Sequence, residues 1–288
     1  MVRPFLSLLV AAVATVTGFA LSWIGASTHA ALVARLEPDP VGLALGIVGA
    51  LVLGIAALSV AIHWVGALVV GAIHGLLGLL ALVVPFGNPF AGGIFSPVFQ
   101  ITRMLSKVDP ALGDGATMFY FSGTALVVGA FLIGAALGIR SRRLAGPSGA
   151  KAVAVSSSLS AGTLLGASAL LLIAGGTFAQ QIFQLLRYDA VSASIAVVAG
   201  VFAGLAGLML RWSSIGVILP ATVVFVAGVV LFAGLLPLPP SFPGRLPAAY
   251  GLVMVAGATF LGSAIGGVVR GRPEAVVDPD ALSPPVAL

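Results

Sequence analysis

His74 is the side chain of this 288-residue sequence best placed for chemistry, because it stands in the middle of a long apolar segment, GAIHGLLG. An imidazole at such a position could ligate haem, relay a proton or bind a substrate. The other histidines cannot complete a haem site with it. His29 falls in a predicted outer segment, and His63 is 11 residues away, roughly 16 Å along a helix. We interpret His74 either as a substrate or pathway residue or as a neutral imidazole hydrogen-bonded inside a packed bundle.

A cluster of hydroxyl side chains opens a later apolar segment. It contains Ser156, Ser158, Ser160 and Thr163. These hydroxyls could line a polar pathway, or they could bond to carbonyl groups of their own helix. No histidine or aspartate is expected at their depth to complete a nucleophilic triad. Pro220 interrupts another apolar segment and could bend a helix beside the same pathway.

The acidic side chains of the sequence do not form the pattern of a catalytic or metal site, and no thiol is present. Asp39 and Asp189 directly precede apolar segments, which favours a helix-capping role for both. The chain contains no cysteine, and this excludes disulfides, zinc–thiolate sites and iron–sulfur clusters. We therefore expect no catalytic residue, no metal and no cofactor, and we interpret the protein as a non-enzyme.

The composition identifies the solvent that surrounds these residues. Hydrophobic residues make up 60% of the chain and charged residues only 7%, whereas about 25% of the residues of a soluble domain carry charge. So few charges cannot solvate the surface of a globule of this size. The sequence thus predicts an integral membrane protein with a lipid bilayer as its surroundings. It excludes a soluble enzyme and, despite the net charge of +5, a nucleic-acid-binding domain.

Charge-free intervals are long enough for eight membrane-spanning helices, at about 20 apolar residues per crossing. The predicted spans are 5–24, 41–62, 65–84, 116–139, 152–174, 191–210, 214–235 and 248–269. The first run has the basic start of a secretory signal, but it is longer than a usual signal and lacks a clean cleavage motif. We therefore expect it to remain as a span. The aromatic residues near predicted span ends are interpreted as interfacial anchors; they are Trp23, Trp64, Trp212, Tyr120, Tyr188 and Tyr250.

Basic residues predict the orientation, because they favour the cytoplasmic side of short loops. With the N-terminus inside, eight basic residues are cytoplasmic and five are external. The cytoplasmic set is Arg3, Arg140, Arg142, Arg143, Lys151, Arg211, Arg270 and Arg272, and the external set is Arg35, Arg103, Lys107, Arg187 and Arg245. Both termini are therefore predicted inside. Abundant Ala, Gly, Val and Arg with little Lys is typical of GC-rich bacterial genes, which indicates a bacterial plasma membrane.

The two halves of the sequence can be aligned with each other. A shift of 150 positions places Asp39 on Asp189, and a shift of 128 positions in the last span of each half places Gly134 on Gly262. Since four helices are an even number, both copies enter the membrane from the same side. The sequence thus predicts two parallel four-helix repeats related by a pseudo-twofold axis along the membrane normal.

The predicted units are 1–145, which includes an external loop at 85–115, and 146–272. A tail at 273–288 is rich in proline and acidic residues and is predicted to be disordered on the cytoplasmic side.

Small residues four positions apart form a stripe on four of the predicted spans. They are Gly42, Gly46, Ala50 and Gly54; Ser192, Ala196, Gly200 and Gly204; Gly134 and Gly138; and Gly262 and Gly266. Residues at this spacing share a helix face, and small side chains there let two helix backbones approach closely. We predict that these stripes are helix-packing surfaces.

Two loops have an amphipathic pattern. Within 85–115, Ser96 and the proline after it predict the start of a helix that ends before Asp109. A similar pattern occurs in 175–190. Such helices are expected at the outer interface, where they could cover the bundle, close over a cavity or bind an envelope partner.

Two functions fit these patterns. The first is a non-catalytic multi-pass membrane subunit that packs within a cell-envelope or membrane protein complex, with another membrane protein or a second copy as its partner. The alternative is a channel, facilitator or flippase for an uncharged or lipid-like substrate, with His74, the hydroxyl cluster and Pro220 along its pathway. The absence of Asp, Glu, Lys and Arg from the predicted spans disfavours a proton- or sodium-coupled carrier.

Overall fold

The computed structural model of this protein describes residues 2–33, 35, 37–83, 97–142, 150–185, 189–236, 238–239 and 241–270. In that part of the chain, the long helices are α1 (Val2–Val33), α2 (Pro40–Leu58), α3 (Trp64–Val83), α7 (Thr124–Arg142), α8 (Ala150–Leu185), α9 (Ala190–Leu208), α10 (Ile215–Phe232) and α12 (Leu252–Arg270). The shorter ones are α5 (Pro97–Val108), α6 (Pro110–Phe121), α11 (Arg245–Ala249) and the 3-10 turns η1 (Ser59–Ala61) and η3 (Met209–Arg211).

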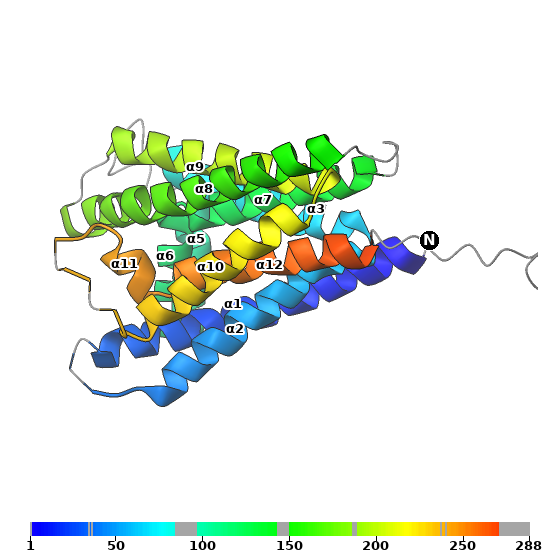
Figure 1. Ribbon diagram of the computed structural model, residues 1–288. Coiled ribbons are helices and arrows are strands. Elements are labelled where there is room, and N and C mark those ends of the chain that lie inside the picture. The colour runs from blue at the N-terminus through cyan, green and yellow to red at the C-terminus, as the bar shows by residue number, and fades with distance from the viewer. Residues whose placement is uncertain are drawn as a thin grey trace, which may run out of the picture.

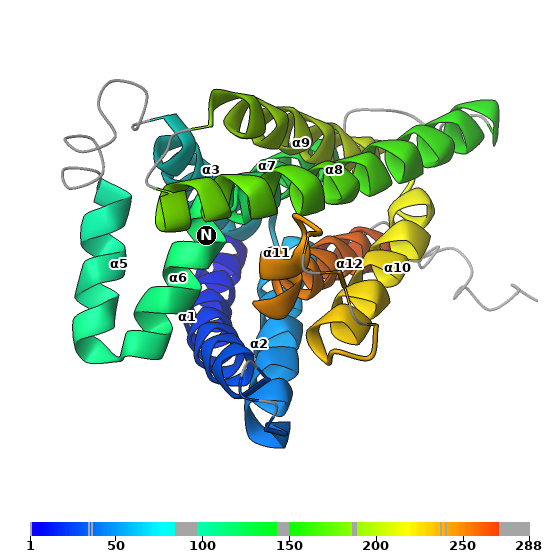
Figure 2. The same cartoon turned by 90° about the vertical axis from the view of Figure 1, so that its left-hand side faces the viewer.

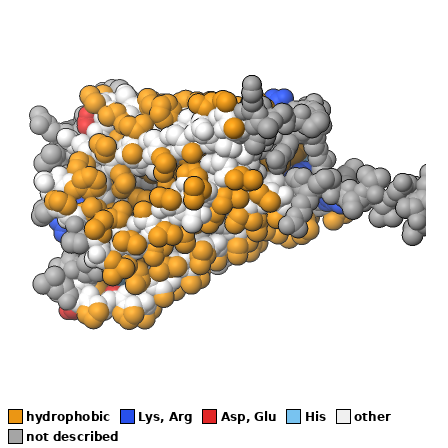
Figure 3. Space-filling model, in the orientation of Figure 1, with side chains coloured by type: hydrophobic (Ala, Val, Ile, Leu, Met, Phe, Trp, Pro, Cys, Tyr) orange, Lys and Arg blue, Asp and Glu red, His pale blue; other side chains and the backbone are white. Residues whose placement is uncertain are grey.

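The eight long helices are each long and apolar enough to cross a bilayer, which confirms the predicted number of spans. They run lengthwise beside one another, while α5 and α6 lie across them near one end (Figures 1 and 2). Apolar side chains cover most of the flank, and the visible charged side chains lie toward its two ends (Figure 3). The chain is therefore an all-α, multi-pass membrane protein whose flank faces lipid.

Two helices are longer than predicted. Helix α1 extends well past the end of the predicted 5–24 span, as far as Val33. Helix α8 continues to Leu185 through the segment at 175–190, where we expected a separate amphipathic helix. No proline occurs in α8 to interrupt it. Gly175 and Gly176 continue the helix, and they let α8 pass directly against Ser122 and Pro243. The prediction of a separate helix after residue 174 was wrong.

The fourth span begins later than predicted. Residues 116–121 belong to α6, whose first turn is capped by Asp109, and the span itself begins at Thr124. Between them Gly123 has a φ of +80°, a left-handed conformation that favours glycine and ends a helix. Gly251, with a φ of +62°, makes the same break before α12. The predicted spans 116–139 and 248–269 include these two glycines, because the spans were placed from charge-free intervals, which do not show a break in a helix.

The packing of the helices couples the two halves of the chain. Helix α1 packs on α2 and α8 packs on α9, while α3 packs on α7 and α10 packs on α12. The remaining large contacts join the halves, because α7 packs on α9 and α12 packs on α2. Four of the long helices, α2, α7, α9 and α12, therefore form the main contact between the halves.

Small-residue stripes form these crossings between the halves. A Cβ added to Gly134 would overlap the backbone of Gly204, and a Cβ added to Gly262 would overlap the backbone of Gly54. One turn further along, Cβ atoms at Gly138 and Gly266 would lie 2.7 Å and 3.2 Å from backbone oxygens of the same partner helices. The close backbone contacts that the stripes predicted are present, and they lie within one chain.

The remaining stripe residues also face neighbouring helices of the same chain. A Cβ at Gly46 would lie 2.6 Å from the ring of Phe232, and a Cβ at Gly200 would lie 3.0 Å from the side chain of Leu126. The others, Gly42, Ala50, Ser192 and Ala196, are buried. The stripes therefore close this bundle and are not free surfaces for a partner.

Both aspartates that precede spans are helix caps, as predicted. Asp39 accepts a hydrogen bond from the backbone N–H of Gly42 at 2.9 Å, and Asp189 accepts one from Val191 at 3.0 Å.

Next to the first cap, His29 joins the two halves. Its Nε2 lies 2.9 Å from the carbonyl oxygen of Phe232, and its Nδ1 lies 3.3 Å from that of Asp39.

Polar contacts also tie helices together at the other end of the bundle. The Ser7 hydroxyl donates to the carbonyl oxygen of His63 at 2.6 Å, and the Arg270 guanidinium donates to that of Val60 at 2.9 Å. The Arg140 guanidinium lies 4.7 Å above the ring of Trp64. The start of α1 and the end of α12 thus lie at the same end of the molecule.

Candidate functional site

His74 lies in a buried cluster of aromatic rings between α1, α3 and α6. Its ring centroid is 4.8 Å from that of Phe19 and 5.8 Å from that of Phe119, and Tyr120 stacks on its other side at 6.0 Å. Trp23 stacks on Phe19 at 4.8 Å. The interpretation of Trp23 and Tyr120 as interfacial anchors was wrong, because both are at most 8% exposed and pack inside the protein.

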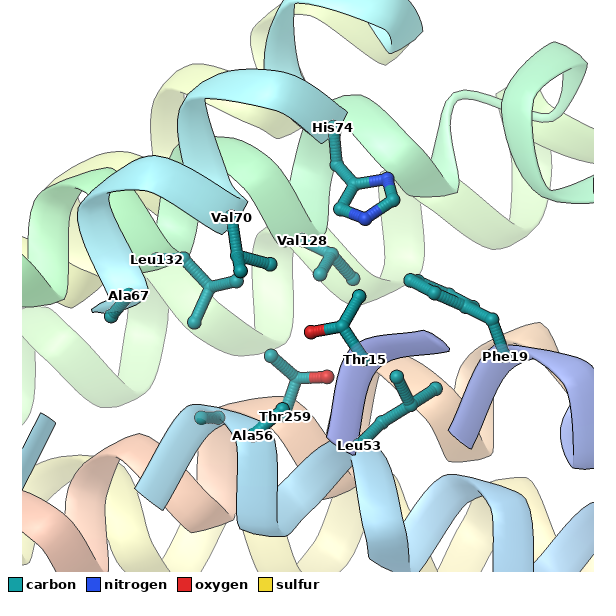
Figure 4. Close-up of a pocket in the computed structure, with 11 residues that line it drawn as sticks. Thr15, Phe19, Leu53, Ala56, Ala67, Val70, His74, Val128, Leu132 and Thr259 are labelled. Atoms are coloured by element: carbon teal, nitrogen blue, oxygen red, sulfur yellow. The ribbon is translucent and has the colours of Figure 1, made fainter. Parts of the chain in front are cut away.

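The hydroxyl of Tyr120 fixes one edge of the imidazole. It lies 3.1 Å from Nδ1 of His74, and burial raises the pKa of Tyr120 to about 12, so the phenol keeps its hydrogen. This contact depends on α6, which lies across the bundle and brings the tyrosine against α3. The second ring nitrogen of His74 points toward the side on which Thr15 lies (Figure 4).

A small cavity borders this second nitrogen. Eleven residues from α1, α2, α3, α7 and α12 line it, and most of them are aliphatic. The polar exceptions are Thr15, His74 and Thr259, which are 7%, 8% and 3% exposed. Both threonine oxygens point into the space between α1 and α12 (Figure 4). The arrangement can hold a small hydrogen-bonding molecule between three helices.

The two threonines differ in their hydrogen bonds. The Thr259 hydroxyl donates to the carbonyl oxygen of Val255 in its own helix at 2.9 Å. The Thr15 hydroxyl is buried and has no hydrogen-bond partner within the described residues. A buried hydroxyl without a partner costs free energy, about 1–3 kcal/mol in protein interiors. Thr15 is therefore the group of the cavity that most requires a ligand.

The hydroxyl cluster of α8 lies away from this cavity. Ser158 and Thr163 donate to backbone oxygens one turn earlier, at 3.2 Å and 2.8 Å, and Ser160 donates to Ser157 at 3.0 Å. Ser156 is buried at the same end of α8. None of these four residues lines the cavity with His74. The structure therefore does not bring the predicted pathway residues together.

Pro220 is also outside the cavity. It is buried within α10, and the helix continues through it from Ile215 to Phe232. The residue at the corresponding place in the first half, Val70, does line the cavity. Pro220 and His74 therefore occupy different parts of the bundle.

Sequence reasoning missed Thr15, Thr259 and Tyr120 as the polar groups around His74. A threonine inside an apolar helix gives no distinct signal, because most of them bond to their own helix. In the described part of the chain, no three His, Asp or Glu side chains converge on a possible metal position.

A second distinct feature is the hairpin of α5 and α6. The predicted amphipathic helix is present as α5, and it packs mainly on α6 and, less extensively, on α3. Met104 and Val108 of this helix are 67% and 78% exposed, and Arg103 and Lys107 are exposed beside them. Residues 85–96 of the predicted external loop lie outside the described residues.

Comparison with known proteins adds no relative. No protein family model, no curated protein and no solved structure matches this chain.

Proposed function

We propose that this protein is a non-catalytic membrane subunit that binds a partner protein through the α5–α6 hairpin in the plasma membrane of a bacterium. The bundle is closed by direct backbone contacts at its glycines, which suits a rigid scaffold. Its eight spans contain no Asp, Glu or Lys, the groups that carry most coupled transport and intramembrane catalysis.

The exposure of α5 is the observation that carries this proposal. A helix at the edge of the bundle exposes two large apolar side chains, Met104 and Val108, next to Arg103 and Lys107. Apolar anchors flanked by Arg are typical of surfaces that bind a partner. The small-residue stripes are buried in the bundle, so α5 is the surface left for this role.

Site-specific photo-crosslinking tests the proposal. A photoreactive amino acid at position 104 should crosslink to a second protein in native membranes, while the same probe at Leu219, which is 73% exposed on the flank of α10, should crosslink mainly to lipid. A second copy of the chain in the product identifies a homo-oligomer. If both positions give only lipid adducts, this surface binds no partner and the proposal is wrong.

We also propose that the chain consists of two parallel four-helix repeats with both termini in the cytoplasm. The pairing of the helices supports this architecture, since α1–α2, α3–α7 and α7–α9 have counterparts in α8–α9, α10–α12 and α12–α2. The matched caps at Asp39 and Asp189 and the matched breaks at Gly123 and Gly251 support it as well. Arg140 and Arg270 lie at the end where α1 begins, which agrees with a cytoplasmic location of that end.

A facilitator or flippase for uncharged or lipid-like substrates is the second candidate. The cavity beside His74 favours a facilitator for solutes about the size of water, because polar groups from three helices line it at a depth where lipid surrounds the protein. Liposomes that contain only this protein should then swell in solutions of small uncharged solutes, and His74→Ala should change the rate. Pro220→Leu is the matched variant outside the cavity. A swelling rate equal to that of protein-free liposomes excludes a facilitator, whereas a flippase requires a lipid-scrambling assay.

A further inference from the structure

The cavity beside His74 combines a small volume with several polar groups. Its volume is about 10 Å³, which is room for about one water molecule. Thr15, His74 and Thr259, from α1, α3 and α12, contribute its polar atoms. A buried water requires two to four such partners, and this cavity supplies them.

The hydroxyl of Thr15 points to the presence of a ligand. It is more than nine-tenths buried, faces the cavity and has no hydrogen-bond partner among the residues that the structure describes. Inside a bilayer, bulk water cannot satisfy such a group. A molecule bound in the cavity can do so without any rearrangement of the helices.

We propose that this cavity binds one water molecule, which bridges Thr15 on α1 and Thr259 on α12. The hydroxyl oxygens of these two residues point toward the same space between their helices (Figure 4). Water suits the site because it both donates and accepts hydrogen bonds. Thr259 donates to Val255 and retains lone pairs that accept from the water.

The bridge would link the first half of the chain to its last helix at the depth of His74. Because α1 and α3 pack together and α12 packs on α2, the water lies where these contacts converge. The ligand is confined to water or a molecule of the same size, since the aliphatic walls leave no room for a larger one. The inference is independent of any partner at α5.

Radiolytic labelling of the purified protein tests for the water directly. X-rays convert bound water to hydroxyl radicals, which oxidise the side chains in contact with it. Phe19 lines the cavity and should be oxidised although it is only 5% exposed. Phe260, which is completely buried and does not line the cavity, is the matched control and should stay unmodified. If Phe19 is as unreactive as Phe260, the cavity holds no water.

Replacement of the Thr15 hydroxyl gives a second test, because the direction of the change in apparent Tm differs between a cavity with water and one without. Thr15→Val keeps the shape of the side chain but removes a partner of the water, so we expect a lower apparent Tm and a loss of Phe19 oxidation. Without a water, the same change removes an unsatisfied buried hydroxyl, and the apparent Tm should stay the same or rise. Thr163→Val is the control, because that hydroxyl bonds only within its own helix. If Thr15→Val does not fold, the labelling of the unmodified protein still decides the question.

Discussion

Glycine-to-alanine replacement measures how much the backbone contacts between the halves contribute to stability. At position 262 the new Cβ would overlap the carbonyl oxygen of Gly54 and would lie 2.8 Å from its carbonyl carbon and 3.0 Å from its Cα. These are backbone atoms that cannot rotate away, so α12 and α2 must move apart. Overpacking of this kind costs about 1–3 kcal/mol, while the higher helix preference of alanine offsets up to about 1 kcal/mol.

The chain supplies a matched control for this variant. An added Cβ at Gly162 of α8 would meet no atom within 4 Å, so Gly162→Ala gains the helix preference without the steric cost. The difference in unfolding free energy between Gly162→Ala and Gly262→Ala therefore isolates the steric contribution, and we expect it to be about 1–3 kcal/mol.

Unfolding in mixed micelles of rising SDS fraction, followed by circular dichroism, provides the assay. Gly262→Ala should unfold at a lower SDS fraction than the parent protein, and Gly162→Ala should unfold at an equal or higher fraction. Gly134→Ala, whose new Cβ would overlap the backbone of Gly204, should behave like Gly262→Ala. Equal midpoints for the variants at 162 and 262 would show that the backbone contact does not contribute to the stability of the bundle.

Three further predictions concern the two ends of the molecule. The chain has no cysteine, so a single introduced cysteine can report the orientation. An impermeant maleimide added to intact cells should label Ser241→Cys in the predicted outer loop and should not label Ser148→Cys in the predicted cytoplasmic linker. The reverse labelling pattern would contradict the predicted orientation. Asp39→Ala should lower the unfolding free energy by about 1 kcal/mol, because the helix cap is lost. Asp39→Ser should keep most of the stability of the parent protein, because serine can also cap the helix. Burial and the Asp114 carboxylate raise the pKa of Tyr250 above 10, so its neutral form stabilises the fold fully below pH 10 and this contribution is lost as the pH rises through the higher folded pKa. Difference absorbance at 295 nm between the parent and Tyr250→Phe should place this titration above pH 10, and a midpoint at or below 10 refutes it.

Much of the fold could be predicted from the sequence, because lipid imposes simple rules on composition. The eight apolar segments, the caps at Asp39 and Asp189 and the helix that begins after Ser96 follow from residue types within a few positions of one another. The break at Gly123 was missed because the whole charge-free interval from 116 to 139 was assigned to one span. Ser122 and Thr124 flank this glycine, and a Ser-Gly pair is a turn signal that composition alone does not weigh.

The candidate site was only partly predictable. The sequence indicates His74, because a lone imidazole in an apolar helix is unusual. Its partners come from other helices: Thr15 is 59 positions away and Tyr120 is 46 positions away, and the second contact requires α6 to lie across the bundle. The α8 hydroxyls gave the stronger signal because they are clustered in sequence, yet Ser158 and Thr163 bond to their own helix.

The pairing of α7 with α9 and of α12 with α2 has a consequence for biogenesis. Helix α2 packs on α12, and the ribosome completes α12 only when it reaches residue 270. Until then the glycine face of α2 is in contact with lipid. During this interval the final helix of another nascent copy presents the same complementary face. When several copies are inserted close together, two chains can therefore exchange their α12 helices and form a domain-swapped dimer. A larger distance between the translating ribosomes would favour the monomer.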